Sequence, residues 1–152
     1  MTTTLPNSEE RHEELMQEVG GLLLDVAGED FRRVDVLVKM TVAVHDLAMT
    51  VYLTDGSTAE VAPPEGLLTA FAELREVVHR LGRGTWFSAR AVLNAPARID
   101  ITYNLDHDPQ WRPEIPAVHF ARDLEAFPRD EVFVPDWLRS KLTGAGVEEQ
   151  RA

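Results

Sequence analysis

Apolar residues recur every three or four positions in three stretches of the chain, which is the spacing of one face of an α-helix. The first stretch begins at Asn7, the expected N-cap, with Glu10 at the capping-box position, and it ends at Gly28. The second runs from Pro64 to Leu81 and is closed by Gly82, and the third runs from Pro116 to Phe127. The three apolar stripes are Leu15, Val19, Leu22 and Val26; Leu67, Phe71, Leu74, Val78 and Leu81; and Phe120, Leu124 and Phe127. One or two further helical turns begin at residues 134–138, and residues 1–6 and 144–152 are expected to be frayed.

Alternation of apolar and polar residues predicts five strands. The first covers residues 33–42, with Val34, Val36, Val38, Met40 and Val42 on one face. Strands 48–53 and 58–61 form a hairpin around an Asp-Gly turn, and strands 86–93 and 98–103 form a second hairpin with Ile99, Ile101 and Tyr103 facing inward. The element order, α-β-β-β-α-β-β-α-α, predicts one α+β domain over residues 1–152 whose mainly antiparallel sheet is covered by helices.

Charge is distributed unevenly along the 152 residues, whose formal net charge is −11. Residues 1–30 hold eight acidic residues and one arginine, and residues 104–136 hold eight acidic residues and three arginines, whereas residues 31–103 are balanced. We do not expect nucleic acid as a partner, because phosphate binding needs a basic face. A basic protein or a cationic ligand fits the charge better, although acids that only keep the protein soluble would give the same pattern.

Location and redox chemistry follow from what the sequence lacks. No apolar run approaches the roughly 20 residues that span a bilayer. The N-terminal residues lack the basic start and apolar stretch of a signal peptide, so we expect a cytoplasmic protein with no membrane partner. The chain has no cysteine, which excludes disulfides, thiolate metal sites and thiol nucleophiles.

Residues 102–113 leave the last strand and hold the main candidates for a binding surface; we call this segment the exit loop. Its sequence is Thr-Tyr-Asn-Leu-Asp-His-Asp-Pro-Gln-Trp-Arg-Pro. Prolines stiffen it, so its carboxylates lose little conformational entropy on binding. The candidate partner-binding acids are Asp106, Asp108, Glu114, Asp123 and Glu125. Trp111 and Tyr103 are candidate interface anchors, and anchoring of the core or the loop is the competing interpretation.

Catalytic and metal chemistry have less support. The sequence contains no P-loop, no dinucleotide-binding glycine motif and no nucleophile elbow. Asp106-His107-Asp108 lacks the oxygen-rich spacing of a calcium loop, and zinc would require His45, His107 and His119 to converge. An acid pair such as Asp106 with Glu114 or Asp123 is a conceivable catalytic site. His79 is expected in the last turn of the second helix, where a cation suits the helix dipole. We therefore expect no metal, no cofactor and no enzymatic activity.

Five motifs between residues 65 and 142 occur in a fixed order. They are Leu67–Leu74 followed by Arg75, Gly84-Thr-Trp-Phe-Ser-Ala-Arg, Arg98-Ile-Asp-Ile-Thr-Tyr-Asn-Leu-Asp, Asp123-Leu-Glu-Ala-Phe-Pro-Arg and Val134-Pro-Asp-Trp-Leu. This arrangement resembles the YezG-like immunity proteins of polymorphic toxin systems, in particular actinobacterial-type relatives. It differs where Asn104 and Leu105 separate the tyrosine from the first acid.

The resemblance implies an antitoxin that neutralises a toxin domain, often a nuclease, by stoichiometric binding. The acidic segments fit this role independently, since many such toxin domains are basic. Two other hypotheses stay open, namely a peptide-binding chaperone or secretion adaptor, and a small enzyme with an acid-based site. The sequence does not specify the toxin or the oligomeric state.

Overall fold

The computed structural model describes residues 8–151, and it describes side chains for residues 8–143. The expected N-cap Asn7 and the expected frayed residues 1–6 lie outside the described residues. The elements are α1 (Ser8–Ala27), β1 (Phe31–Met40), β2 (His45–Leu53), β3 (Thr58–Glu60), α2 (Leu67–Val78), β4 (Ser88–Asn94), β5 (Arg98–Asn104), α3 (Ala117–Ala126), the short 3-10 helix η1 (Glu131–Phe133) and α4 (Asp136–Arg151). The predicted order of helices and strands is confirmed, with η1 as an addition.

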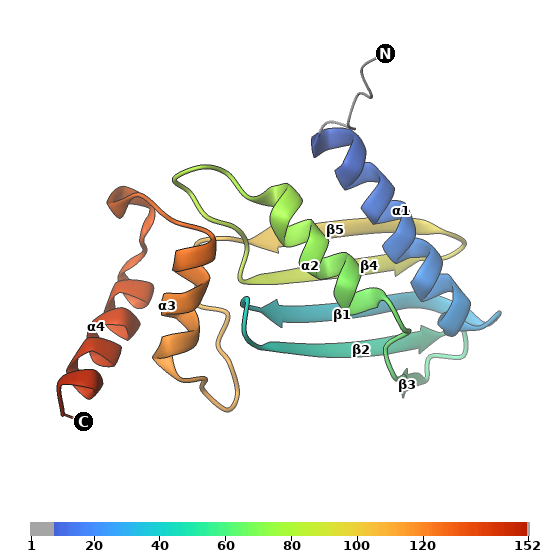
Figure 1. The fold of residues 1–152 in the computed structure, drawn as a ribbon. Helices are drawn as coiled ribbons and strands as arrows, with labels where there is room; N and C mark the ends of the chain where they lie inside the picture. Colours follow the sequence, from blue (N-terminus) through green and yellow to red (C-terminus); the bar gives the residue numbers. More distant parts are fainter. Residues whose placement is uncertain (1–7, 152) are drawn as a thin grey trace, which may run out of the picture. The chain divides into compact units, whose positions relative to one another are not determined.

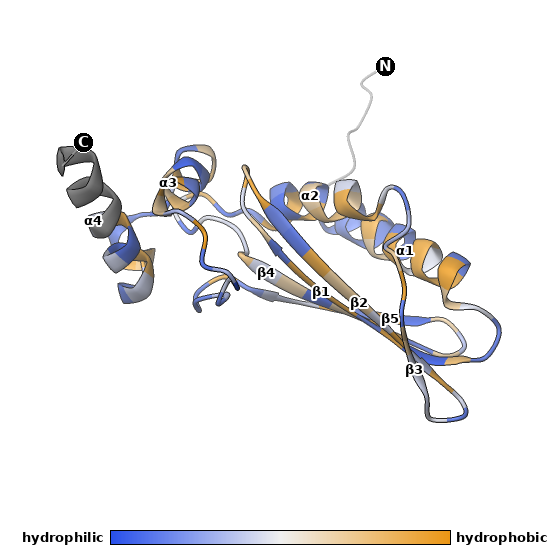
Figure 2. Cartoon of the chain, turned by 90° about the horizontal axis from the view of Figure 1, so that it is seen from below, coloured by the Kyte–Doolittle hydropathy of each residue, from blue (hydrophilic) through white to orange (hydrophobic). Residues whose placement is uncertain are grey.

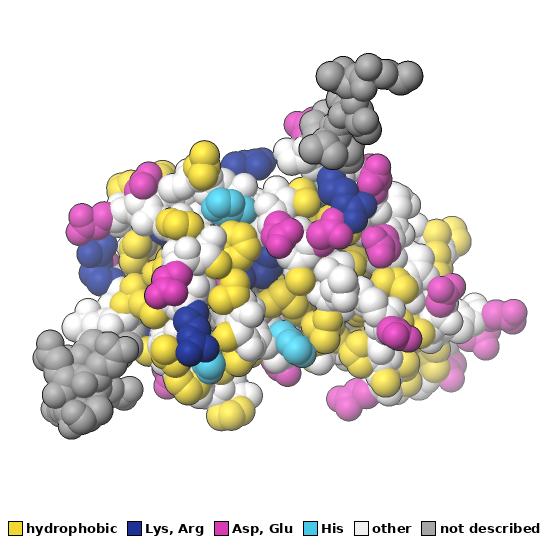
Figure 3. All heavy atoms as spheres, viewed as in Figure 1, with side chains coloured by type: hydrophobic (Ala, Val, Ile, Leu, Met, Phe, Trp, Pro, Cys, Tyr) yellow, Lys and Arg dark blue, Asp and Glu magenta, His cyan; other side chains and the backbone are white. Residues whose placement is uncertain are grey.

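The strands form one antiparallel sheet in the order β3-β2-β1-β4-β5, and helices pack on it (Figure 1). This confirms the predicted α+β class. Both α1 and α2 lie on the same side of the sheet (Figure 2). Glutamates line the outward side of α1, so acidic side chains gather over these two helices (Figure 3).

The chain divides into two compact units, each built from three stretches. The first unit comprises Met1–Leu37, Leu47–Val78 and Arg90–Thr102, and the second comprises Val38–Asp46, His79–Ala89 and Tyr103–Ala152. Stretches from the two units alternate along the sequence, so no single cut of the chain separates them. The single domain expected from the chain length stays a prediction.

In the first unit, α1 and α2 contribute the buried helix faces. The buried residues of α1 are Leu15, Val19, Gly20, Leu23 and Ala27. The predicted stripe was therefore wrong by one position in its second half, because Leu22 and Val26 are only half-buried. Gly20 faces β5, where an added Cβ would touch Ile99 at 3.5 Å, an ordinary contact distance.

The α2 helix confirms its predicted core but is shorter than expected. Phe71 and Leu74 are fully buried. The helix ends at Val78, so His79 does not lie in its last turn and Gly82 does not cap it. Leu81 is 94% exposed, which corrects its place in the apolar stripe. The chain instead turns between Arg80 and Gly84, whose backbones bond to each other.

The second unit has its own apolar core, which we call the aromatic core. Phe87, Phe120 and Leu138 are its buried centre, and Trp137 contacts Phe87 and Phe120 edge to face, with ring centroids 5.3 and 5.7 Å apart. Edge-to-face geometry is favourable because the positive ring edge meets the negative ring face. The partly buried residues packed on this centre are Trp111, Ile115, Leu124, Val134, Trp137 and Leu142. Trp137 and Leu138 belong to α4, which continues to Arg151, beyond the one or two turns predicted and into the residues expected to be frayed.

Candidate functional site

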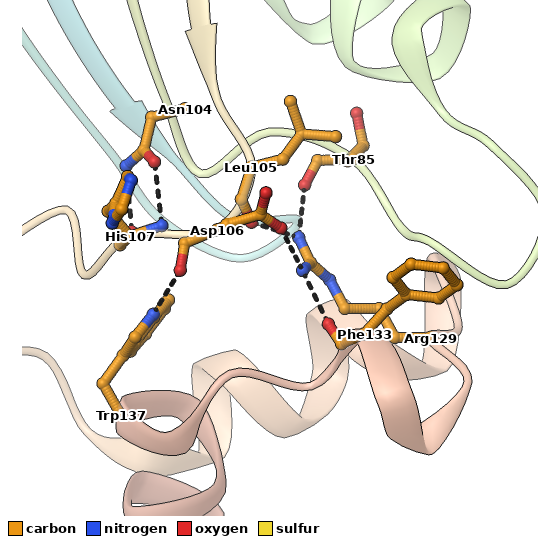
Figure 4. Close-up of polar contacts among 8 residues, drawn as sticks. All are labelled: Thr85, Asn104, Leu105, Asp106, His107, Arg129, Phe133 and Trp137. Atoms are coloured by element: carbon orange, nitrogen blue, oxygen red, sulfur yellow. Dashed lines mark hydrogen bonds and ion pairs between the residues drawn. The ribbon is translucent and has the colours of Figure 1, made fainter.

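A buried arginine organises the exit loop. The side chain of Arg129 is 1% exposed, and its guanidinium donates hydrogen bonds to the backbone oxygens of Phe133 (3.0 Å), Thr85 (3.0 Å) and Leu105 (2.6 Å) (Figure 4). It also lies 4.9 Å above the Phe87 ring, a cation–π distance. A guanidinium can serve several acceptors at once because its donors form a fixed fork. Arg129 therefore joins three segments that are distant in sequence.

The turn at residues 82–84 makes room for this arginine. Gly84 has φ of +75°, and a Cβ added there would lie 2.6 Å from Nε of Arg129. Gly82 accepts a hydrogen bond at its backbone oxygen from the N–H of Asp130 (2.6 Å). Side chains are excluded at Gly84 for both reasons, conformation and space. The Gly-Arg-Gly sequence at residues 82–84 is thus a turn that accommodates the Arg129–Asp130 segment.

Two further side chains fix the main chain of the exit loop. The indole N–H of Trp137 donates to the backbone oxygen of Asp106 (2.8 Å). Asn104 accepts from the N–H of His107 and donates to its oxygen, both at 2.9 Å, so it closes a tight turn (Figure 4). Farther along, Lys39 donates to the backbone oxygen of Gln110 (2.7 Å). The loop is therefore held mainly through its backbone.

The acidic side chains of this segment point outward from a fixed backbone. The Asp106 side chain is 61% exposed and lies 3.6 Å from Arg129. The Glu114 side chain is 74% exposed and accepts a 2.6 Å hydrogen bond from Lys141. This bond lowers the pKa of Glu114, so its carboxylate stays ionised at neutral pH. Asp108 is half-buried and uses Oδ1 to accept from the N–H of Gln110 (2.9 Å), while Glu125 on α3 is exposed.

Asp123 requires a correction. It was predicted to be part of the acidic binding surface, but it is only 2% exposed. Its Oδ1 accepts a 2.9 Å hydrogen bond from the N–H of Val42. A carboxylate in this position supports the turn after β1 and is not available to a partner. The suggested catalytic pair of Asp106 with Asp123 stays a prediction.

The two candidate aromatic anchors lie mainly inward. Trp111 is half-buried against the aromatic core, and its indole N–H is buried without an acceptor among the described side chains and backbone. Tyr103 is half-buried and stacks on Trp86, with centroids 6.0 Å apart, and burial raises its pKa. Both arrangements favour the competing interpretation, in which these residues hold the fold.

The three histidines considered as zinc ligands differ in their exposure to solvent. His45 and His107 are exposed and His119 is half-buried. Within residues 8–143, no group of three or more histidines and carboxylates is placed to hold a metal ion. His79 packs edge-on against Phe127, with centroids 5.1 Å apart, instead of capping α2.

A groove of about 740 Å³ opens beside the exit loop; we call it the α4 groove. Its wall on α4 consists of Trp137, Ser140 and Lys141, and the other lining residues are Asp108, Glu114, Ile115, Pro116 and Ala117. A smaller hollow of about 120 Å³ shares Asp108, Glu114, Ile115 and Lys141 and reaches Trp111. Ligand pockets commonly have volumes of about 300–1,000 Å³. Two predicted binding residues, Asp108 and Glu114, therefore meet at a concave surface.

Sequence reasoning missed the residues that hold this site, namely Arg129, Trp137 as a hydrogen-bond donor, and Lys141. The sequence gives no clear signal for Arg129. Its motif, Pro-Arg-Asp at residues 128–130, packs on the Gly-Arg-Gly turn of residues 82–84, which lies far earlier in the chain. No helix in the part of the chain that the structure describes is long and apolar enough to cross a membrane. Comparison of the sequence with protein-family models and with curated proteins finds no match.

Proposed function

We propose that this chain is an immunity protein that binds a basic toxin domain stoichiometrically and thereby neutralises it. The observation that carries the proposal is the exit loop, whose backbone is fixed by Arg129 and Trp137 while the carboxylate of Asp106 remains 61% exposed. The carboxylate of Glu114, the residue just after the loop, is 74% exposed. Such a surface binds with little further ordering, which favours affinity. Its charge would steer a basic partner and raise the association rate by about 10- to 1,000-fold at low salt.

The same features give less support to an acid-catalysed enzyme. A general acid needs a pKa near the working pH, and the Lys141 ammonium holds the pKa of Glu114 below its usual value. Exposed carboxylates on a rigid loop are suited to recognition of a cation. Copurification separates the remaining possibilities: one tight partner supports the immunity role, many clients support a chaperone or adaptor, and turnover without a partner supports an enzyme.

The direct test uses the cognate toxin domain, which is to be sought in the neighbouring coding sequence. We expect the double variant Asp106→Asn/Glu125→Gln to stay folded, because both substitutions are nearly isosteric and both side chains are exposed. Its association rate should fall about tenfold at 50 mM salt, and the difference should shrink at 1 M, where the Debye length is about 3 Å. Glu13→Gln/Glu18→Gln on the exposed side of α1 also removes two negative charges, in the other unit, and is the matched control.

Two outcomes would refute the proposal. One is full toxicity in cells that co-express the wild-type chain with the toxin domain. The other is an association rate that is equally sensitive to Glu13→Gln/Glu18→Gln and to Asp106→Asn/Glu125→Gln. Trp111→Ala is not a suitable binding probe, because Trp111 packs on the aromatic core and its removal would destabilise the fold.

A further inference from the structure

The α4 groove combines three chemical features within one concavity. The Trp137 ring offers an aromatic wall, and its orientation is fixed by the hydrogen bond from its N–H to Asp106. Ile115, Pro116 and Ala117 supply apolar lining. Asp108 and Glu114 supply carboxylates, and Lys141 supplies the one cation among the groove's described lining residues.

The carboxylates retain capacity for a ligand. Asp108 uses Oδ1 for the N–H of Gln110, which leaves Oδ2 for another donor. Glu114 uses Oε1 for Lys141, which leaves Oε2. Because Lys141 is already paired, the groove carries one uncompensated negative charge, and a cationic ligand is favoured over an anionic one.

We propose that the α4 groove receives an arginine side chain of the partner protein, an inference that rests on the proposed function. The aliphatic part of the arginine would lie on the apolar lining, and its guanidinium would stack on Trp137 and donate to the free oxygens of Asp108 and Glu114. Arginine fits better than lysine, because a planar guanidinium both stacks on an aromatic ring and donates in two directions. The partner's residue would thereby occupy a position next to the ammonium of Lys141.

The test needs no partner. The chain contains three tryptophans, so its indole N–H groups give three separate signals in a ¹⁵N-correlated NMR spectrum. N-acetyl-arginine amide is titrated into the whole chain, and N-acetyl-citrulline amide serves as the neutral ligand of nearly the same shape. We expect the arginine compound to shift the Trp137 signal saturably and at least tenfold more tightly than citrulline. The signal of Trp86, which is fully buried and does not line the groove, should not move.

The variant Asp108→Asn/Glu114→Gln should weaken arginine binding at least tenfold. Both substitutions keep the oxygens that accept from Gln110 and Lys141, so the groove should keep its shape, which a thermal melt checks. Glu18→Gln removes an exposed acid on α1, outside the groove lining, and should leave arginine binding unchanged. Equal binding of citrulline, no saturable shift, or binding indifferent to the double variant would overturn the inference.

The result is separable from the proposed function. If arginine fails to bind while the chain still neutralises the toxin, the groove assignment is wrong and the immunity role stands. If arginine binds and neutralisation fails, the immunity role is wrong and the groove is a site for cationic side chains of another partner. Neutralisation that survives Asp108→Asn/Glu114→Gln at full strength would overturn the claim that the toxin's arginine occupies the groove.

Discussion

Replacement of Arg129 tests the central claim about how the exit loop is held. Arg129→Met keeps the length and apolar body of the side chain and removes its donors. Three hydrogen bonds from a charged donor are lost, each worth about 1.5–3 kcal/mol. The net loss should be smaller than the sum of about 4.5–9 kcal/mol, because the carbonyl of Leu105 can regain water if the loop opens. We expect the free energy of unfolding to fall by about 3–5 kcal/mol, the range found when one partner of a buried charged pair is removed.

Urea unfolding, followed by circular dichroism and tryptophan fluorescence, measures this loss. With a slope of about 2 kcal/mol per molar urea, the midpoint should fall by about 1.5–2.5 M. The free energy of unfolding of Arg129→Lys should lie between those of the wild-type protein and Arg129→Met, about 2 kcal/mol below wild type. An ammonium group cannot reach three carbonyls from three segments. Arg122→Met is the matched control, since Arg122 is exposed on α3 and such changes cost about 0.5 kcal/mol or less. A loss below about 1 kcal/mol for Arg129→Met would refute the reasoning.

Four further substitutions and the addition of a chelator or a metal ion provide the remaining tests. Phe71→Ala should cost about 3–5 kcal/mol of unfolding free energy because Phe71 is fully buried, and a loss near 1 kcal/mol would contradict its place in the core. Gly84→Ala should lower the melting temperature, because its Cβ would clash with Arg129. Gly21→Ala has open space on α1 and should raise the free energy of unfolding by about 0.5–1 kcal/mol. A higher melting temperature for Gly84→Ala than for Gly21→Ala would refute both. Asp35→Asn should make the stability fall less steeply below pH 4. The hydrogen bond from Arg90 on β4 lowers the folded-state pKa of Asp35 below its ordinary 3.8, so the stabilisation is present above pH 3.8 and is lost as the pH falls through the folded-state pKa. Equal pH slopes for the variant and the wild-type protein would contradict this. Chelator, calcium or zinc should leave the melting temperature unchanged, and a reproducible rise with one ion would reveal a metal site.

The sequence was informative where local spacing decides the structure. The alternation in β1 correctly placed Val34, Val36 and Val38 inside, because a strand has only two faces. Helix faces are less sharply defined, because neighbouring residues are separated by only about 100° around the helix axis, whereas in a strand they point to opposite faces. In α1, Leu23 is therefore buried where Leu22 was predicted. The end of α2 was also misplaced: Leu81 continues the apolar spacing, but the chain has already turned away from the core.

The candidate site could be predicted only in part. The exit loop was recognised from its prolines and acids. The side chains of Asp106 in the loop and of Glu114 just after it are exposed. The burial of Asp123 was not predictable, because its partner is the backbone N–H of Val42, which lies 81 positions earlier in the chain. Arg129 was missed for the same reason. A lone arginine between a proline and an aspartate looks like a surface charge until folding brings the carbonyls of Thr85, Leu105 and Phe133 around it.

The way in which the exit loop is anchored has an evolutionary consequence. Arg129, Trp137 and Lys39 all bind main-chain oxygens of this loop, and a main-chain oxygen is present whatever amino acid occupies the position. The side chains at positions 105 and 106 can therefore be exchanged while the loop keeps its course, whereas position 110, with φ of 57°, favours residues that tolerate the left-handed conformation. Under the proposed immunity function, mutational drift at positions 105 and 106 would alter partner recognition without compensating changes in the scaffold. The loop would then be a starting point for a library of redesigned specificities.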